Sequence, residues 1–283
     1  MLRNSEVPRD MTVMSHIAKS TGWSELTRSV GDRFVPQLSL PGLHVDYGAM
    51  GCELAAFYRE VGCVEWRSQP NPNIHGASLS INPDHDAKDW IHASFGHPRY
   101  QVESKSGYYA AVEADIANRV KGDYLDSLGF RRLHPSLYRY CPTIVALLES
   151  FSVPVVRVTA RTILGHRCAP SANANNTGGF HTDDSPFEVL RVNVAIDNDG
   201  SFGLEYEDGS VVRMTSGANA VVNSDVRHRV HLSRPTLRAR THLVIGLAPW
   251  LKYDQRADAW MLNEHAGVTH PYDMAKMGLL TKR

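Results

Sequence analysis

The stretch FGLEYEDGSVVRM at residues 202–214 decides the fold class, because it predicts a β-hairpin. Asp208 and Gly209 lie between two strand-like runs, and an Asp-Gly pair in this position signals a tight turn between antiparallel strands. Further strand-like runs flank the hairpin: VPVVRVTA (153–160), RVNVAID (191–197), ANAVVN (218–223) and RTHLVIGLAP (240–249). Several short strands separated by turn signals indicate an antiparallel barrel or jelly roll.

The residues on either side of this β-rich region have a different pattern. Apolar spacing predicts helices around 14–28, 47–61, 107–128 and 141–151, and a short strand at 77–81 lies among the loops of 68–98. We expect one unit over 1–283. It comprises an N-terminal support region (1–152), a β-core (153–249) and a C-terminal tail of helix and loop (250–283).

Composition excludes several classes of protein. The 283 residues include 30 Lys and Arg and 30 Asp and Glu, so the zero net charge disfavours a nucleic-acid or anionic-membrane partner. No apolar run approaches the roughly 18–20 residues that span a bilayer, and the first residues lack the apolar core of a secretory signal. The four cysteines form no CxxC pair, which favours reduced thiols in a cytoplasmic protein.

One histidine–carboxylate pair has the spacing of metal ligands. His181 and Asp183 are two residues apart, so on an extended chain their side chains point to the same side. His228, in a strand–loop–strand setting, supplies a third ligand. Two imidazoles and one carboxylate on one face leave open positions on an octahedral iron(II).

Other residues compete for these roles. His44 and Asp46 repeat the spacing, but they lead into a predicted helix. His231 is an alternative to His228. Asp184 is an alternative to Asp183, although its position has the wrong parity for a strand.

Two strand arginines fit an anionic ligand of such a metal. Arg191 shares a strand face with Asn193, and Arg240 shares one with His242, while valine, leucine and isoleucine occupy the opposite faces. A guanidinium makes a planar two-point contact with a carboxylate, which favours a binding role over that of a surface charge. Arg238 has the same strand phase as Arg240 and is its rival.

The block from Val155 to Pro249 resembles the iron(II)/2-oxoglutarate oxygenases. Within them it resembles the aspartyl/asparaginyl β-hydroxylase-like group, which includes bacterial proline cis-hydroxylases. The matching residues are His181-x-Asp183, Arg191-x-Asn193-x-Ala195-x-Asp197, Gly217 before AVVN, His228-x-Val230 and Arg240-x-His242. Many relatives have His where Asn193 stands. The loop between His228 and Arg240 is about two residues longer than usual, so Arg238 remains an alternative to Arg240 for binding the co-substrate.

The resemblance implies a mainly β protein with flanking helices and a double-stranded β-helix core, a jelly roll of the cupin kind. It implies that His181, Asp183 and His228 bind Fe(II). It also implies that Arg240 binds the far carboxylate of 2-oxoglutarate, with Arg191 also at the co-substrate. O₂ is the second co-substrate. The expected reaction hydroxylates an amino acid or amino-acid-like small molecule, with release of succinate and CO₂.

Several alternatives stay open. The substrate can instead be a peptide or protein side chain, or the chain can be a cupin-like binding protein without turnover. The loop Cys168–Gly179 is a lid or an inserted surface loop, and His75 and Ser78 are candidate substrate contacts. A monomer and a homodimer are both compatible with the sequence. No GxSxG, P-loop or GxGxxG motif is present, which disfavours hydrolase and nucleotide-binding readings.

Overall fold

The computed structural model describes residues 45–66, 74–81, 83, 101–103, 127–164, 180–183, 186–187, 189–224, 226–234, 236–257 and 259–282. The helices predicted at 14–28 and within 107–126, the loop Cys168–Gly179, His44 and Asp184 lie outside the described residues. The helices in the described part are α3 (Tyr47–Glu60), α6 (Leu137–Tyr140), α7 (Pro142–Glu149) and α8 (Pro271–Lys276), with a 3₁₀ turn at Ser127–Gly129. None of them is long and apolar enough to cross a bilayer.

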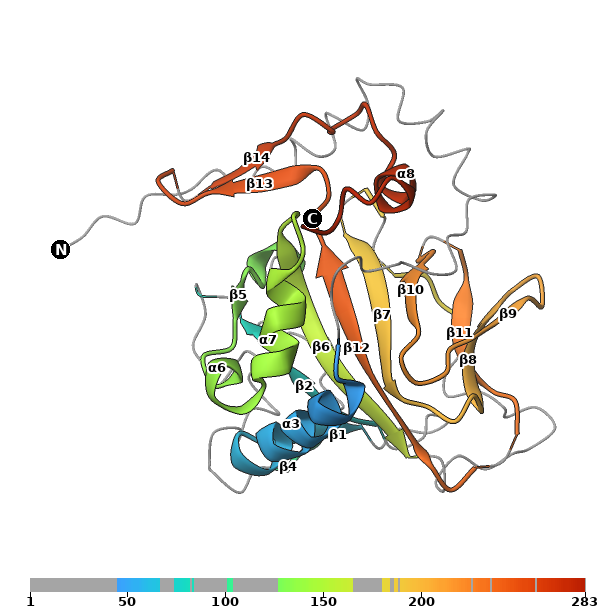
Figure 1. Ribbon diagram of the computed structural model, residues 1–283. Helices are drawn as coiled ribbons and strands as arrows, with labels where there is room; N and C mark the ends of the chain where they lie inside the picture. The colour runs from blue at the N-terminus through green and yellow to red at the C-terminus, as the bar shows by residue number, and fades with distance from the viewer. Residues whose placement is uncertain are drawn as a thin grey trace.

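The larger sheet has seven strands in the order β10-β7-β12-β6-β2-β1-β4, and neighbouring strands run antiparallel (Figure 1). Its strands are β1 (Cys63–Trp66), β2 (Ile74–Ser78), β4 (Gln101–Glu103), β6 (Val155–Leu164), β7 (Leu190–Asp197), β10 (Asn219–Val222) and β12 (Ala239–Leu247).

A smaller sheet has the order β11-β8-β9, formed by β11 (His228–Leu232), β8 (Phe202–Tyr206) and β9 (Val211–Arg213). The predicted hairpin is confirmed, since β8 and β9 pair antiparallel around Asp208 and Gly209. The Asp208 carboxylate accepts a hydrogen bond from the Ser210 amide at 2.8 Å. Gly209 has a φ of 83°, which a glycine adopts without a steric penalty.

The chain alternates between the two sheets, which is the topology of a double-stranded β-helix. β6, β7, β10 and β12 belong to the larger sheet. The segments between these strands belong to the smaller sheet, which β8, β9 and β11 form. Residues 180–183 join its edge, because His181 makes a β-bridge with His228 of β11. The predicted mainly β, jelly-roll core is therefore confirmed.

The apolar core lies between the larger sheet and the helices. Side chains of β7 and β12 pack there against α3 and α7, in a cluster that includes Val192, Val194, Leu243, Ile245, Met50, Phe57, Ile144 and Leu148. Figure 1 shows α3 and α7 on one side of the larger sheet and the smaller sheet on the other. Arg191, Asn193, Arg240 and His242 alternate with these core residues, so they lie on the face toward the smaller sheet. We call this face the inner face.

Three features differ from the sequence-based expectation. β6 continues to Leu164, past the predicted end at 160, because it pairs with β12 on one side and β2 on the other. A two-stranded sheet of β3 (Ser80–Ile81) and β5 (Arg132–Leu133) lies beside it. The C-terminal tail contains a hairpin of β13 (Leu251–Asp254) and β14 (Ala259–Leu262) ahead of its helix α8.

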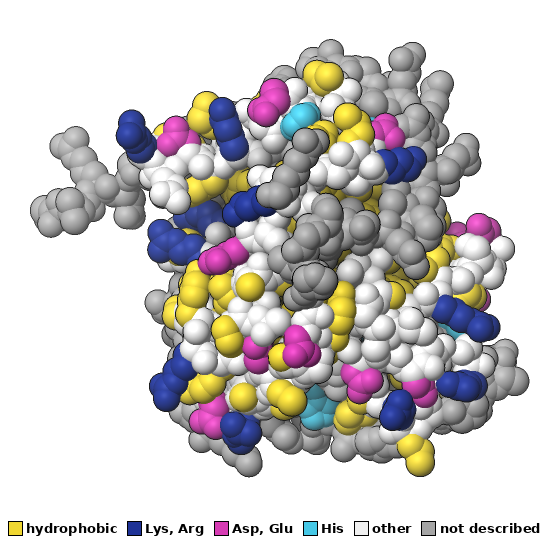
Figure 2. Space-filling model, viewed as in Figure 1, with side chains coloured by type: hydrophobic (Ala, Val, Ile, Leu, Met, Phe, Trp, Pro, Cys, Tyr) yellow, Lys and Arg dark blue, Asp and Glu magenta, His cyan; other side chains and the backbone are white. Residues whose placement is uncertain are grey.

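Surface charges are mixed on the face shown in Figure 2, where Lys and Arg side chains are scattered among Asp and Glu. The buried charges differ, because Arg240 is the one Lys, Arg, Asp or Glu residue in the described part whose side chain is fully buried. The inner face therefore carries the one fully buried charged side chain of the described residues.

Candidate metal centre

A pair of backbone hydrogen bonds brings two of the predicted ligands together. The His181 amide donates to the His228 carbonyl at 3.0 Å, and the His228 amide donates to the His181 carbonyl at 2.9 Å. The Asp183 amide donates to the Ser224 carbonyl at 3.0 Å. Directly opposed residues of an antiparallel pair project side chains to the same side, and the two imidazole rings lie 4.8 Å apart.

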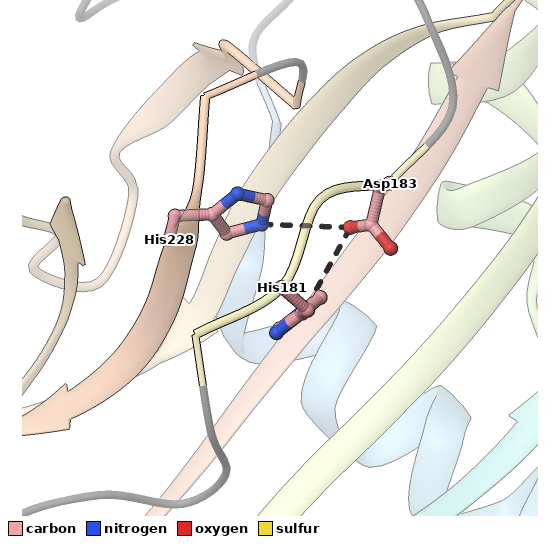
Figure 3. Close-up of side chains that lie close together, drawn as sticks. All are labelled: His181, Asp183 and His228. Atoms are coloured by element: carbon pink, nitrogen blue, oxygen red, sulfur yellow. Dashed lines mark ion pairs between the residues drawn. The ribbon is translucent and has the colours of Figure 1, made fainter. Parts of the chain in front are cut away.

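The three ligand atoms converge on one small region (Figure 3). One ligand atom each from His181, Asp183 and His228 lies within 4.8 Å of the others. Asp183 Oδ2 is 3.9 Å from His181 Nε2 and 3.5 Å from His228 Nε2. The His228 side chain is 5% exposed and that of His181 is 51% exposed, so the centre opens to solvent on the His181 side.

The hydrogen bonding of His228 prepares it to bind a cation. Its Nδ1 lies 2.9 Å from the Val226 carbonyl oxygen, so in the neutral ring Nδ1 carries the proton and donates it. Nε2 then has a lone pair facing the Asp183 carboxylate. The His228 Nε2 lone pair and the Asp183 carboxylate oxygen repel each other unless a positively charged group, either a metal ion or a proton, lies between them. The donor set therefore fits a divalent metal such as iron(II).

Asp183 is held in its ionised form. Burial alone raises the pKa of this carboxyl, but the hydrogen bond with His228 and the charges of Arg191, His181 and Arg161 outweigh burial and hold the pKa well below its usual range. Arg191 Nη1 lies 3.1 Å from Asp183 Oδ2. The side chain that was predicted to meet the co-substrate thus contacts the carboxylate of a candidate metal ligand.

Arg240 is a buried cation with unused donors. Its side chain is fully buried, and its Nε and Nη1 atoms have no hydrogen-bond partner among the described residues. Burial, and then the charge of Arg161, lower the pKa of Arg240 to about 10. Asn193 Oδ1 and His242 Nδ1 are also buried on the inner face without a partner. An anionic ligand would satisfy the two guanidinium nitrogens, whereas the Asn193 oxygen requires a hydrogen-bond donor.

His242 is kept neutral. Burial lowers its pKa well below the usual value, and the charges of Arg240 and Arg161 lower it further. The β12 register places His242 opposite Arg161 of β6 on one side and Ala195 of β7 on the other.

The rival residues lie elsewhere. Arg238 is exposed ahead of β12, where its amide donates to Thr236 Oγ1 at 3.0 Å. The structure therefore brings Arg240, and not Arg238, to the inner face. Asp46, from the second His-x-Asp pair, caps α3 by accepting from the Ala49 amide at 2.9 Å.

His231 belongs to a group of polar contacts around Glu205 on the outer side of the smaller sheet. Glu205 Oε2 lies 3.1 Å from His231 Nδ1 and 2.8 Å from Arg229 Nη2. The Arg229 guanidinium stacks 4.2 Å from the centre of the Phe180 ring, immediately before His181. These contacts connect β8 and β11 to the segment that carries two of the three candidate ligands, and they place His231 outside the candidate centre.

The proposed substrate contacts His75 and Ser78 do not join the triad. His75 lies on the helix side of the sheet, with Nδ1 3.8 Å from Cys63 Sγ, and it lines a cavity against α3. Ser78 is buried in β2, where it pairs with Thr159 of the neighbouring strand β6.

Sequence reasoning missed Arg161, which lies on the inner face within electrostatic reach of Asp183, Arg240 and His242. The signal was available, since Thr159, Arg161 and Ile163 continue the alternation of the predicted strand.

No family model and no curated protein sequence matches the chain. Solved structures resemble parts of it. The non-heme α-ketoglutarate-dependent epimerase SnoN of nogalamycin biosynthesis is 13% identical, over 80% of this chain and 84% of its own, with a TM-score of 0.34. IDO from Bacillus thuringiensis is 10% identical over 78% and 95%, with a TM-score of 0.36. An RmlC-like cupin protein from Desulfovibrio desulfuricans is 15% identical over 35% and 84%, with a TM-score of 0.23. With scores this low, the functional interpretation rests on the chain's own residues.

Proposed function

We propose that this protein is an Fe(II)- and 2-oxoglutarate-dependent dioxygenase that hydroxylates an unactivated C–H bond of a small, amino-acid-like substrate. The observation that supports the proposal is the convergence of His181, Asp183 and His228 in the same β-helix that buries Arg240, two of whose nitrogens have no partner among the described residues. A metal triad with open positions and a buried cation for a carboxylate are the two requirements of this chemistry.

His181, Asp183 and His228 are the residues that would hold the iron, with three further positions left for ligands. When bound, iron with 2-oxoglutarate and O₂ supplies the oxidising power for C–H hydroxylation, and the co-substrate leaves as succinate and CO₂. The chain's own contribution is to fix the ligands. The backbone bridge between His181 and His228 sets their spacing, and the Val226 carbonyl sets the tautomer of His228.

Arg240 would bind the distal carboxylate of 2-oxoglutarate. The unpartnered Nε and Nη1 are charge-assisted donors for carboxylate oxygens, and binding would satisfy atoms that have no partner among the described residues. Neutral His242 lies two residues from Arg240 on the same face of β12, where it can orient the ligand without adding charge. The Asn193 amide lies farther along the inner face, on β7 opposite Val244.

The test is spectroscopic. Anaerobic addition of Fe(II) and 2-oxoglutarate should give a weak visible charge-transfer band, which His181→Ala should abolish. Arg240→Met should require far more 2-oxoglutarate for the same band, whereas the exposed control Arg238→Met should behave as the wild type. A folded protein that gives no band would contradict the proposal.

Turnover separates the remaining alternatives. Succinate release should be screened across amino acids and short peptides, because the resemblance alone suggests the amino-acid class. Release with peptides only would favour a side-chain hydroxylase. A band without succinate from any compound would favour a binding protein that has lost turnover.

A further inference from the structure

Residues 180–183, which include His181 and Asp183, lie along the edge of the smaller sheet. Figure 3 shows this segment next to the strand that carries His228. Within the described part of the chain, three backbone–backbone hydrogen bonds attach the segment. Two of them join His181 to His228, and the third runs from the Asp183 amide to the Ser224 carbonyl. An edge segment with so few backbone hydrogen bonds depends on side-chain contacts to keep its position.

The register at this edge defines a row of side chains on the other face of the sheet. His181 lies opposite His228, so the next opposed pair of these antiparallel strands is Phe180 and Arg229. Arg229 in turn lies opposite Glu205 of β8. Because successive side chains alternate between faces, Phe180, Arg229 and Glu205 form an outer row on the face opposite to that of the two histidines.

The three side chains of the outer row contact one another in order. The Arg229 guanidinium lies 4.2 Å from the centre of the Phe180 ring, within the range of a cation–π interaction. On its other side, Arg229 Nε and Nη2 lie 2.9 Å and 2.8 Å from Glu205 Oε2. The Arg229 and Glu205 side chains are only 22% and 17% exposed, so solvent screens these contacts in part.

Glu205 keeps the guanidinium in place over the ring. The hydrogen bond from Arg229 holds the pKa of the Glu205 carboxyl below its usual value, so this group is ionised and accepts two charge-assisted hydrogen bonds. The charge of Arg229 is therefore already paired within the fold. Its remaining role is mechanical, because it connects β8 and β11 to Phe180 on the edge segment.

Phe180 is the one apolar residue of the described segment 180–183, since His181, Thr182 and Asp183 are polar. Strand register is weakly specified where a strand has few apolar side chains, and a slip of one residue exchanges the two faces. Such a slip would move the His181 imidazole away from His228 and bring Phe180 to the inner side. The stack on Arg229 opposes this slip, because it holds the Phe180 ring on the outer face.

We propose that Arg229 and Phe180 are positioning residues of the metal centre, whose stack holds His181 in the register that aims its imidazole at the metal. This inference rests on the proposed function, since it concerns the metal triad of that same site. It assigns the two residues a part in metal binding and none in the choice of substrate. The effect acts through His181, so it should vanish when His181 is removed.

The experiment measures Co²⁺ binding to the metal-free protein by competition with a coloured chelator, since Co²⁺ accepts the same imidazole and carboxylate ligands as iron(II). Arg229→Met should weaken Co²⁺ binding about tenfold, the lower end of the range for contacts that orient metal ligands. Phe180→Leu, which stays apolar but removes the ring, should do the same, whereas Phe180→Tyr should keep the wild-type affinity. Arg213→Met is the matched control, because Arg213 is exposed on β9 of the same sheet, and it should change nothing.

A second set of variants separates positioning from a general effect on folding. In His181→Ala, Arg229→Met should weaken the residual Co²⁺ binding no further. An equal loss in both backgrounds would overturn the inference, because Arg229 would then support the sheet as a whole. Unchanged affinity in Phe180→Leu would also overturn it, and this conservative variant tests the stack even if Arg229→Met does not fold.

Failure of this inference differs from failure of the proposed function. Co²⁺ affinity that is unaffected by His181→Ala would contradict the metal centre and with it the proposed function. Affinity that depends on His181 but not on Arg229 or Phe180 would contradict the positioning role alone.

Discussion

Replacing Arg240 with methionine should stabilise the ligand-free protein and remove its response to 2-oxoglutarate. The guanidinium is fully buried, and two of its nitrogens have no partner among the described residues. Its pKa falls from an ordinary 12.5 to about 10. At about 1.36 kcal/mol for each pKa unit, holding the charge in the folded state costs about 3 kcal/mol.

Methionine has a similar length, carries no charge and adapts to irregular spaces. We therefore expect the free energy of unfolding of the metal-free protein to rise by about 1–3 kcal/mol in Arg240→Met, because the desolvation cost disappears. With Fe(II) under argon, 2-oxoglutarate at a hundred times its Kd should stabilise the wild type by about 2.7 kcal/mol. The variant should gain almost nothing, so the difference in stability should shrink or reverse.

Urea unfolding followed by tryptophan fluorescence measures both halves of this prediction, with and without 2-oxoglutarate. Arg238→Met is the control, because Arg238 is exposed and should leave both the stability and the ligand response unchanged. A lower free energy of unfolding in metal-free Arg240→Met would refute the reasoning, since it would mean that the guanidinium is already satisfied in the folded protein.

Three further predictions concern other parts of the molecule. Asp183→Ala should weaken Fe(II) binding more than about 100-fold in a chelator competition, since even an outer contact to a metal ligand is worth about 10–100-fold; retained affinity would exclude Asp183 as a ligand. Burial lowers the pKa of His134 from 6.5 to about 4 in the folded protein. As the pH drops from 6.5 to 4, His134 is therefore protonated in the unfolded chain but not in the folded protein. The free energy of unfolding should fall by up to about 3 kcal/mol over this range. Urea midpoints across this range should flatten in His134→Asn, and an unchanged slope would assign the effect elsewhere. Gly246→Ala should cost about 1–3 kcal/mol in urea unfolding, because its Cβ would lie 2.5 Å from the Val156 carbonyl oxygen. The helical Gly51→Ala, whose Cβ has only an ordinary contact, should instead stabilise the protein.

The sequence was sufficient to predict which side of β7 and of β12 faces the core. In β7, Val192 and Val194 pack against the helices while Arg191 and Asn193 take the other face, as a period of two requires. The Asp208-Gly209 turn was equally readable, because its geometry depends on neighbouring residues alone.

The ends of β6 could not be predicted in the same way. Its continuation to Leu164 depends on hydrogen bonds with β2 and β12, which are distant in sequence, and strand propensity yields to such partners. The bulge at Arg157 depends on how β12 approaches at Gly246. The bulge at Arg157 was overlooked for this reason, whereas Arg161 continues the alternation of the predicted strand and could have been identified from the sequence.

The His-x-Asp spacing was readable but ambiguous, since this chain contains it twice. Local context favoured His181 and Asp183, and the helix cap at Asp46 gives the physical reason that the other pair differs. The contact between Arg191 and Asp183 could not be read from the strand pattern, because it depends on how the segment at 180–183 turns toward β7.

The charge balance of the inner face ties these observations together. Across the chain basic and acidic residues are equal in number, yet among the described residues near the candidate metal centre Arg161, Arg191 and Arg240 accompany the carboxylate of Asp183. Removing a cation from water is unfavourable unless it is paired, so the burial of Arg240, two of whose nitrogens have no partner among the described residues, makes the ligand-free fold less stable. A divalent metal would add to this positive charge, whereas a dianionic co-substrate would offset it. The arrangement therefore favours binding of anions over the empty state, and it links the stability of the protein to occupancy of its own site.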